Sequence, residues 1–141
     1  MTTEPAIRRA TTADVAALLD LWRRAGAHPS PTDTEPDVTR VLEAPHAAAF
    51  VAVDADGLVV GSVIATFDGW RGNVYRMAVD PKVRRLGVAR RLAAEAEGWL
   101  RAAGARRVTA LVEGDREIAR VFWESVGFEH YEGMLRYSKS V

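Results

Sequence analysis

The chain has no cysteine among its 141 residues, which excludes disulfide bonds, a thiol nucleophile and thiolate-bound zinc. No apolar run approaches the ~20 residues that a membrane-spanning helix needs, and no basic segment followed by an apolar one opens the sequence. The formal net charge at pH 7 is +0, so the overall charge favours neither nucleic acid nor a membrane as a partner. From these absences we expect a cytoplasmic protein that does not bind a membrane.

What is present fits one domain over residues 1–141, because this length is enough for a hydrophobic core. Apolar periodicity and turn residues predict a mixed α/β (α+β) fold around one sheet, with a strand–loop–helix unit in the middle. The predicted helices are 11–26, 37–43, 87–103 and 115–126, and the predicted strands are 6–10, 48–53, 58–67, 73–79, 106–112, 128–132 and 134–137. The buried face of the long helix is expected to contain Val88, Leu92, Ala96 and Trp99.

A cluster of basic residues surrounds a glycine where the long helix begins, in "DPKVRRLGVARR". A helix N-terminus exposes unpaired N–H groups and carries partial positive charge, so it binds anions such as phosphates. Gly87 has no side chain to block a ligand, Ala89 is small, and Arg84 and Arg85 can add charge-assisted hydrogen bonds. The loop is therefore chemically suited to a diphosphate.

Two other interpretations of this cluster stay open on the residues alone. The arginines can be a solvated face beside an ordinary helix start, or they can follow the phosphates of a nucleic acid. The second has less support, because no aromatic residues alternate with the arginines and the chain has no basic excess. The loop lacks the Lys-Ser/Thr of a P-loop and the three glycines of a dinucleotide fingerprint.

The segment "MAVDPKVRRLGVARRL" resembles the central motif of the GCN5-related N-acetyltransferase (GNAT) superfamily, V-x-P-x-x-R/Q-x-x-G-x-G/A, with Ala89 as the second small residue. A second segment, "IARVFWESVGF" at 118–128, resembles the closing helix of that family. The resemblance extends over almost the whole chain and is strongest to small, single-domain bacterial members with a loop such as "DGWRG" before the central strand.

The resemblance implies a GNAT fold, with a mixed central sheet of six to seven strands, about four helices, and a parallel strand pair that splays apart. By resemblance the pair is 73–79 with 106–112, and acetyl-CoA (coenzyme A) binds between them. The pantetheine arm would pair with the strand backbone, and the diphosphate would lie on N–H groups of residues 85–90. The implied cofactor-binding residues are Met77, Ala78, Val79, Arg84, Arg85, Leu86, Gly87, Val88, Ala89, Arg90, Arg116 and Trp123.

The implied activity is acetyl transfer from acetyl-CoA to a primary amine of a small molecule or a protein, by direct attack on the thioester. Such an amine arrives protonated, so a base must remove its proton. An N–H near Met77 would stabilise the oxyanion. We expect Asn73, Tyr75 and Met77 to share one face of their strand, where Tyr75 either protonates the leaving sulfur, lines the acceptor site or simply packs. Glu113 is the candidate base or a solvated carboxylate.

The sequence departs from the family where acid–base chemistry is expected. Trp123 replaces a tyrosine acid, Arg116 replaces an asparagine that bonds the pantetheine arm, and Asn73 stands where one branch has a glutamate base. The alternative function is therefore an acyl-CoA-binding regulatory domain with little or no catalysis.

The acceptor itself is not specified by the sequence, since the loops expected to choose it, 27–37 and 68–72, have no defining motif. Within them Asp68 is expected to cap its loop rather than act as a base, and the acidic Glu35 and Asp37 are expected to be solvated. We expect no metal and no nucleic-acid partner, and strands 128–137 could pair across a homodimer.

Overall fold

The computed structural model describes residues 4–112 and 117–141, and its internal contacts divide the chain into two compact units. The first unit ends at Leu111 and contains all five strands assigned in the described residues. The second begins at Val112 and contains helix α4, Glu117–Ser125. Each unit is described separately below, and the expectation of one domain stays a prediction.

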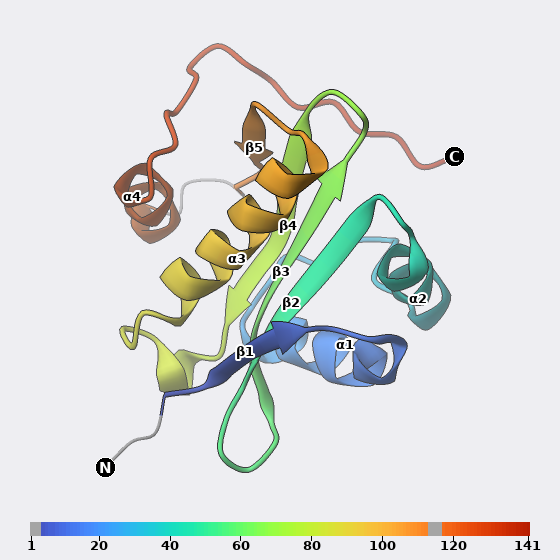
Figure 1. The fold of residues 1–141 in the computed structure, drawn as a ribbon, viewed down its shortest axis with the longest axis vertical. Coiled ribbons are helices and arrows are strands. Elements are labelled where there is room, and N and C mark those ends of the chain that lie inside the picture. The colour runs from blue at the N-terminus through green and yellow to red at the C-terminus, as the bar shows by residue number, and fades with distance from the viewer. Residues whose placement is uncertain (1–3, 113–116) are drawn as a thin grey trace. The chain divides into compact units, whose positions relative to one another are not determined.

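The first unit is built on a sheet in which the strands follow one another in sequence order, β1-β2-β3-β4-β5 (Figure 1). Its strands are β1 Ala6–Arg9, β2 Ala47–Val53, β3 Val59–Phe67, β4 Gly72–Val79 and β5 Val108–Ala110. The first three pairings are antiparallel and the last, between β4 and β5, is parallel. The mixed α/β fold expected from the sequence is confirmed.

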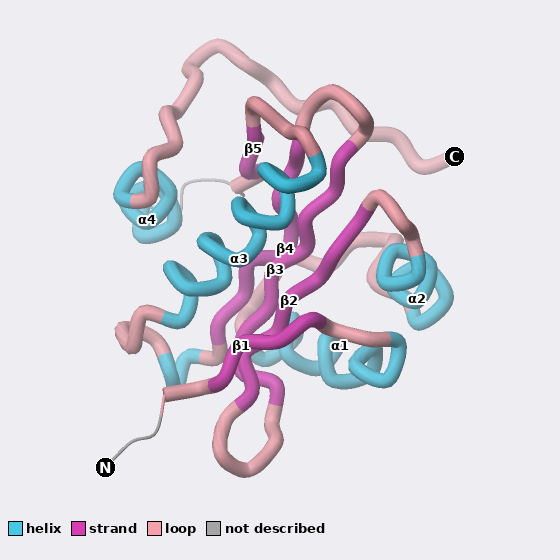
Figure 2. Tube along the Cα trace, viewed as in Figure 1, coloured by secondary structure: helices cyan, strands magenta, loops and turns pink. Residues whose placement is uncertain are grey.

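The expected number of strands is wrong: the sheet has five strands rather than six to seven. Residues 128–132 and 134–137 were predicted as strands, yet the described part of the second unit contains no ladder after α4, and Figure 2 draws this segment as loop. Gly133 adopts φ +85°, which turns the chain between the two predicted strands. Alternating apolar residues favour a strand only where a partner supplies ladder hydrogen bonds, and the proposed dimer pairing through this segment stays a prediction.

Helix α3, Val88–Ala103, covers one face of the sheet, and helices α1, Val15–Arg24, and α2, Glu35–Glu43, cover the other (Figure 1). The α3 face requires close approach: a Cβ on Gly72 would lie 2.8 Å from Leu100 Cδ2. On the opposite face the indole of Trp22 contacts Ser62 of β3. The turn before α1 is closed by a side chain, because Asp14 Oδ2 accepts the Thr11 backbone N–H at 2.8 Å.

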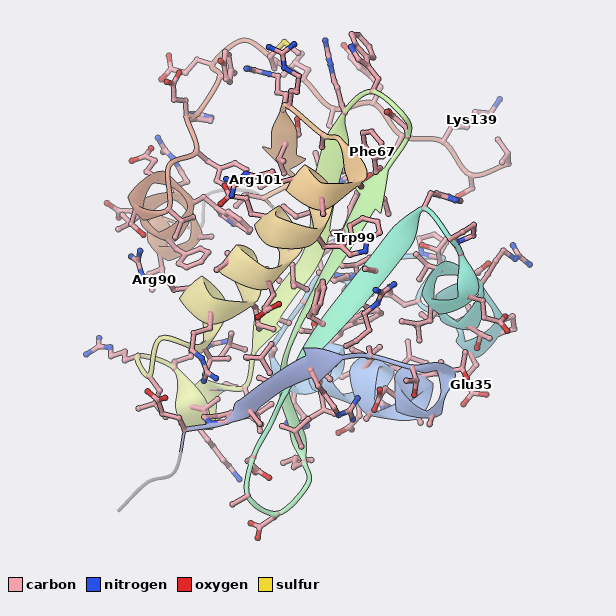
Figure 3. All side chains as sticks on the ribbon, in the orientation of Figure 1. Glu35, Phe67, Arg90, Trp99, Arg101 and Lys139 are labelled. Atoms are coloured by element: carbon pink, nitrogen blue, oxygen red, sulfur yellow. The ribbon has the colours of Figure 1, made fainter. Side chains whose placement is uncertain are left out.

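The buried stripe of α3 differs from the prediction at one position. Val88, Leu92, Ala96 and Leu100 are buried, whereas Trp99 is only partly buried (Figure 3). The four buried residues follow an unbroken i, i+4 row, and Trp99 lies beside that row, where the Arg9 guanidinium is 5.9 Å from its ring centroid.

Candidate active site

The two parallel strands at the edge of the sheet stay together for only three residue pairs. Gly72, Asn73 and Val74 pair with Val108, Thr109 and Ala110. Strand β5 then ends, while β4 continues to Val79. From Tyr75 onward, the β4 edge that faces β5 therefore has no strand partner in the described part of the chain. Backbone N–H and C=O groups on such an edge can pair with an extended ligand.

Strand β4 carries a β-bulge where the pairing with β5 has ended. Ser62 pairs with Ala78 and Ile64 pairs with Tyr75, so Val63 lies opposite two residues, Arg76 and Met77. Arg76 adopts φ +51°, in the left-handed region. A bulge of this type places an extra residue in the strand and redirects the backbone groups beside it.

The bulge overturns one sequence expectation, that Asn73, Tyr75 and Met77 share a face. Residues that oppose each other in neighbouring strands point to the same side of the sheet. Tyr75 opposes Ile64 and Ala78 opposes Ser62, and these two β3 residues share a face because they are two apart. Tyr75 and Ala78 therefore both face α1, and both belong to the core on that side. Because neighbouring strand residues alternate, Met77 faces away from Tyr75. The prediction assumed strict alternation, which the extra residue interrupts.

A buried hydroxyl holds the bulge in place. The Trp22 indole N–H donates to Ser62 Oγ at 3.0 Å, and the Ser62 hydroxyl donates to the Arg76 carbonyl at 2.8 Å. Ser62 has no solvent exposure (0%), so water does not compete for these groups. The bulge carbonyl is therefore fixed by a side chain of β3 and, through it, by α1.

The loop after β4 begins at a buried carboxylate. Asp80 accepts the Lys82 backbone N–H at 2.9 Å and forms an ion pair with Arg24 of α1, which also bonds the Val59 carbonyl at 2.9 Å. The Lys82 N–H and then the Arg24 guanidinium lower the pKa of Asp80 below its usual value. The carboxylate thus starts the short 3₁₀ turn Pro81–Val83 and anchors it to α1.

The loop ends at Gly87, the N-cap of α3, with φ +77°. This left-handed conformation suits glycine, and a Cβ built there meets nothing within 4 Å, so the space beside it is open. The Gly87 carbonyl accepts the first helical hydrogen bond, from Arg91 N–H at 3.1 Å. Within the described residues, the backbone N–H groups of Gly87, Val88 and Ala89 have no acceptor.

The basic residues of the loop have different environments. The Arg84 guanidinium donates to the Val79 and Ala25 carbonyls, each at 3.3 Å, and Arg91 donates to the Pro5 carbonyl at 2.6 Å. Arg85 has φ +71°, and Arg90 lies in the first turn of α3 (Figure 3). Arg84 therefore holds the loop to neighbouring backbone and is not simply part of a solvated face, and Arg91 of α3 holds the segment before β1.

The catalytic candidates are only partly described. Tyr75 is partly buried and packs against the core between the sheet and α1, as its packing interpretation requires. Glu113 and Arg116 lie outside the described residues. Trp123 belongs to the second unit, where its ring stacks edge-on with Phe122 and Phe128 at centroid distances of 5.1 and 5.0 Å. Its role toward the cofactor stays a prediction.

Asp68 has a structural role, as expected. Its Oδ1 accepts the backbone N–H groups of Arg71 at 2.7 Å and Trp70 at 2.8 Å. These two bonds lower the pKa of Asp68, and the bond from Arg71 has the larger effect. The carboxylate is therefore a weaker base than a free one. The Arg71 guanidinium lies 3.9 Å from the Trp70 ring centroid, and Trp70 is 71% exposed.

Arg76 is the site residue that sequence reasoning missed. Its Nη2 donates to both carboxylate oxygens of Asp33, at 2.8 and 2.6 Å. The sequence did contain an indication, because in strict alternation Arg76 would share a face with the apolar Val74 and Ala78. A charged residue in that pattern is a reason to expect a bulge.

Comparison with known proteins identifies the family of this chain. The model of the acetyltransferase (GNAT) family matches residues 15–128, from the first residue of α1 to just beyond α4. The chain belongs to this family. The protein is therefore an acetyl-CoA-dependent N-acetyltransferase, and the open N–H groups at Gly87 and the unpaired edge of β4 fit this cofactor.

Individual relatives agree with the family. Acetyltransferase SG1711 of Sodalis glossinidius (strain morsitans) is 29% identical over 126 residues, which cover 89% of this chain and 88% of the relative. Aminoglycoside N-acetyltransferase AAC(6')-Iy in complex with CoA has the same fold, with a TM-score of 0.80, 24% identity, and coverage of 100% of this chain and 97% of that one. Aminoglycoside 6'-N-acetyltransferase AAC(6')-IG from Acinetobacter haemolyticus has a TM-score of 0.78, 22% identity, and coverage of 96% and 99%.

Two absences hold for residues 4–112 and 117–141, the part of the chain that the structure describes. No helix there has the length and apolarity to cross a bilayer. Nor does that part of the chain bring together three or more His, Asp or Glu side chains that could hold a metal ion.

Proposed function

We propose that this protein acetylates a primary amine of a small molecule or a protein by direct attack of the amine on the acetyl-CoA thioester, in the cytoplasm. One observation carries the proposal: the open N–H groups at the start of α3 are joined by a single loop, 80–87, to the strand whose edge loses its partner at Tyr75. A ligand with an anionic end and an extended, hydrogen-bonding arm matches both features together.

The diphosphate of the cofactor is assigned to residues 85–90. The N–H groups of Gly87, Val88 and Ala89 lie at the N-terminus of α3, a helix of 16 residues, where the partial positive charge of the helix favours an anion. Arg85 and Arg90 add positive charge, and Arg84 keeps the loop in shape by its bonds to main-chain carbonyls. Leu86 completes the loop between Arg85 and Gly87.

The pantetheine arm is assigned to Met77, Ala78 and Val79, alongside β4 in the manner of an added strand. This places the thioester beside the bulge. There the N–H of Met77 is the candidate donor to the oxyanion, because the Ser62 hydroxyl already fixes the neighbouring Arg76 carbonyl.

Proton transfer requires a base for the amine and an acid for the leaving sulfur. A lysine amine has a pKa of about 10.4 and an α-amine about 8, so a base must take a proton before attack. Glu113 is the proposed base and Tyr75 the proposed acid for the leaving sulfur. Arg116 and Trp123 are proposed contacts of the cofactor.

The test is an acetyl-CoA assay with an amine panel: neamine, free lysine, and a short peptide with an unblocked N-terminus. Neamine is included because structural neighbours are aminoglycoside acetyltransferases. We expect thiol release that depends on the amine and rises with pH as the amine loses its proton. Release that is independent of every amine would contradict the proposal.

The alternative expected from the sequence, an acyl-CoA-binding regulator without catalysis, rests only on the departures from the family pattern at Trp123, Arg116 and Asn73, whereas the family and the relatives support catalysis. It predicts micromolar or tighter binding of CoA by calorimetry with no turnover of any amine between neutral and alkaline pH. The same panel therefore separates the two functions.

A further inference from the structure

Arg76 combines an unusual backbone with a largely buried side chain. Its φ of +51° is one that glycine adopts readily and arginine rarely, and its side chain is only 15% exposed. A non-glycine residue persists in such a conformation when its surroundings hold it there, and such residues gather at functional sites.

The guanidinium reaches a segment far away in the sequence. Nη2 bonds both oxygens of Asp33, and Nη1 donates to the His28 carbonyl at 3.1 Å. The guanidinium carbon also lies 5.1 Å from the ring centroid of Trp22, close enough for a cation–π contact. Both Asp33 and His28 belong to the α1–α2 loop, residues 25–34, which joins α1 to α2.

This loop is closed on itself around the same carboxylate. Asp33 Oδ2 accepts the Ser30 N–H at 3.0 Å, and the Ser30 carbonyl accepts the Asp33 N–H at 3.0 Å. The side chain of Arg76 thus holds a folded loop, while its own carbonyl is held by Ser62. One residue connects the loop to the bulge through both its side chain and its main chain.

We propose that Arg76 is a positioning residue that fixes the α1–α2 loop against the β4 bulge, so that the amine meets the acetyl group in one geometry. The inference rests on the proposed function, in which the bulge lies beside the thioester. Because Arg76 already neutralises Asp33, this carboxylate is not free to attract a cationic amine.

The test uses Arg76→Gly and Asp33→Asn in the full-length chain, singly and together. Glycine accepts φ +51° without strain, so Arg76→Gly removes the guanidinium while favouring the bulge. Asparagine keeps the size of Asp33 and an oxygen for the Ser30 N–H. The matched control is Arg23→Ala, which removes an arginine of α1 whose side chain is 78% exposed and donates to Asp20 at 3.4 Å.

The first readout is hydrogen exchange of the Ala27 amide, which bonds the Trp22 carbonyl of α1, and of the Ser30 amide, which bonds Asp33 within the loop. We expect at least tenfold faster exchange in both single variants, no further increase in the double variant, and no change in Arg23→Ala. Unchanged exchange in Arg76→Gly would overturn the proposed tether.

The second readout is kinetic, with the panel amine that gives the largest kcat/KM. We expect KM for that amine to rise at least tenfold in Arg76→Gly, while the calorimetric Kd for CoA stays within twofold of wild type. A Kd that rises as much as KM would overturn the positioning role, since it would indicate general damage. Wild-type protein without turnover on any amine would contradict the proposed function, and the exchange measurement would then still decide the tether.

Discussion

The loop after β4 and the bulge within β4 are neighbours in the sequence, but backbone groups form the first and side chains from other elements hold the second. The loop presents backbone N–H groups, whose direction is set by local conformation at Gly87 and by the start of α3. The bulge is held by side chains that come from other elements, chiefly Ser62 and Trp22. A site made of main chain is specified by a short local motif, whereas a site made of distant side chains is specified only by the fold.

The largest expected effect on cofactor binding tests the main-chain half of this comparison. Gly87→Glu would place a side chain and negative charge in the space that the diphosphate requires, and would strain a φ of +77°. We expect CoA affinity to fall at least 100-fold by calorimetry, about 2.7 kcal/mol. Gly87→Asn is the control, because asparagine tolerates this φ and is neutral, so it should lose less than half of that free energy. Equal affinity of Gly87→Glu and wild type would refute the assigned cradle.

The side-chain half is tested by Ser62→Ala. The Trp22 indole N–H and the Arg76 carbonyl would both lose their bonds in a site without water, which lowers the free energy of unfolding by about 3 kcal/mol. Urea denaturation measures this loss. Adding Trp22→Phe to Ser62→Ala should cost less than the two single losses combined, since the orphaned N–H is gone. Full additivity would show that the hydroxyl does not connect the two groups.

Asp80→Asn tests the ion pair between Asp80, where the loop after β4 begins, and Arg24 of α1. Losing the charge beside Arg24 should lower the free energy of unfolding at pH 7 by about 2 kcal/mol. The folded-state pKa of Asp80 is below the unfolded value, so its contribution is complete above about pH 3.9 and disappears as pH falls through the lower folded pKa. The gap between variant and wild type should therefore close in acid.

The control for this anchor is Asp20→Asn, since Asp20 also bonds Arg24, at 2.8 Å, but is 48% exposed. It should change the free energy of unfolding by no more than about 0.5 kcal/mol. An effect as large as that of Asp80→Asn would mean that burial does not distinguish the two carboxylates.

The smallest effects concern the helix that carries the loop. Gly72→Ala would bring a Cβ to 2.8 Å from Leu100 Cδ2 and destabilise the protein by about 1 kcal/mol. Gly98→Ala, in the middle of α3, meets nothing within 4 Å and should stabilise it by up to about 1 kcal/mol. Thermal unfolding would show the two changes with opposite signs, and equal signs would contradict the packing of α3 on the sheet.

The same division explains what could be predicted from sequence. The helix start at Gly87, the closing strand residues before Pro81 and the capping Asp68 each depend on a few neighbouring residues, and each was predicted. The charge of Arg76 among apolar alternate residues is the only local sign of the bulge, whose position depends on pairing with β3, and its ion pair depends on a loop 43 residues away, which no local pattern gives. The late strands failed for the same reason, because residue preference does not supply a ladder partner.

In β4 two residues, rather than the one of a regular strand, lie between Tyr75 and Ala78, which face the same side of the sheet. Up to Tyr75 the strand presents alternate residues to its two faces in one phase, and from Ala78 onward it presents them in the opposite phase. Removing one residue at position 76 or 77 would leave one residue opposite Val63, so Ala78 would still oppose Ser62 and the entry to the loop at Asp80 would keep its register. Such a deletion should therefore remove the bulge and leave the rest of the sheet in place, whatever amine the protein acetylates.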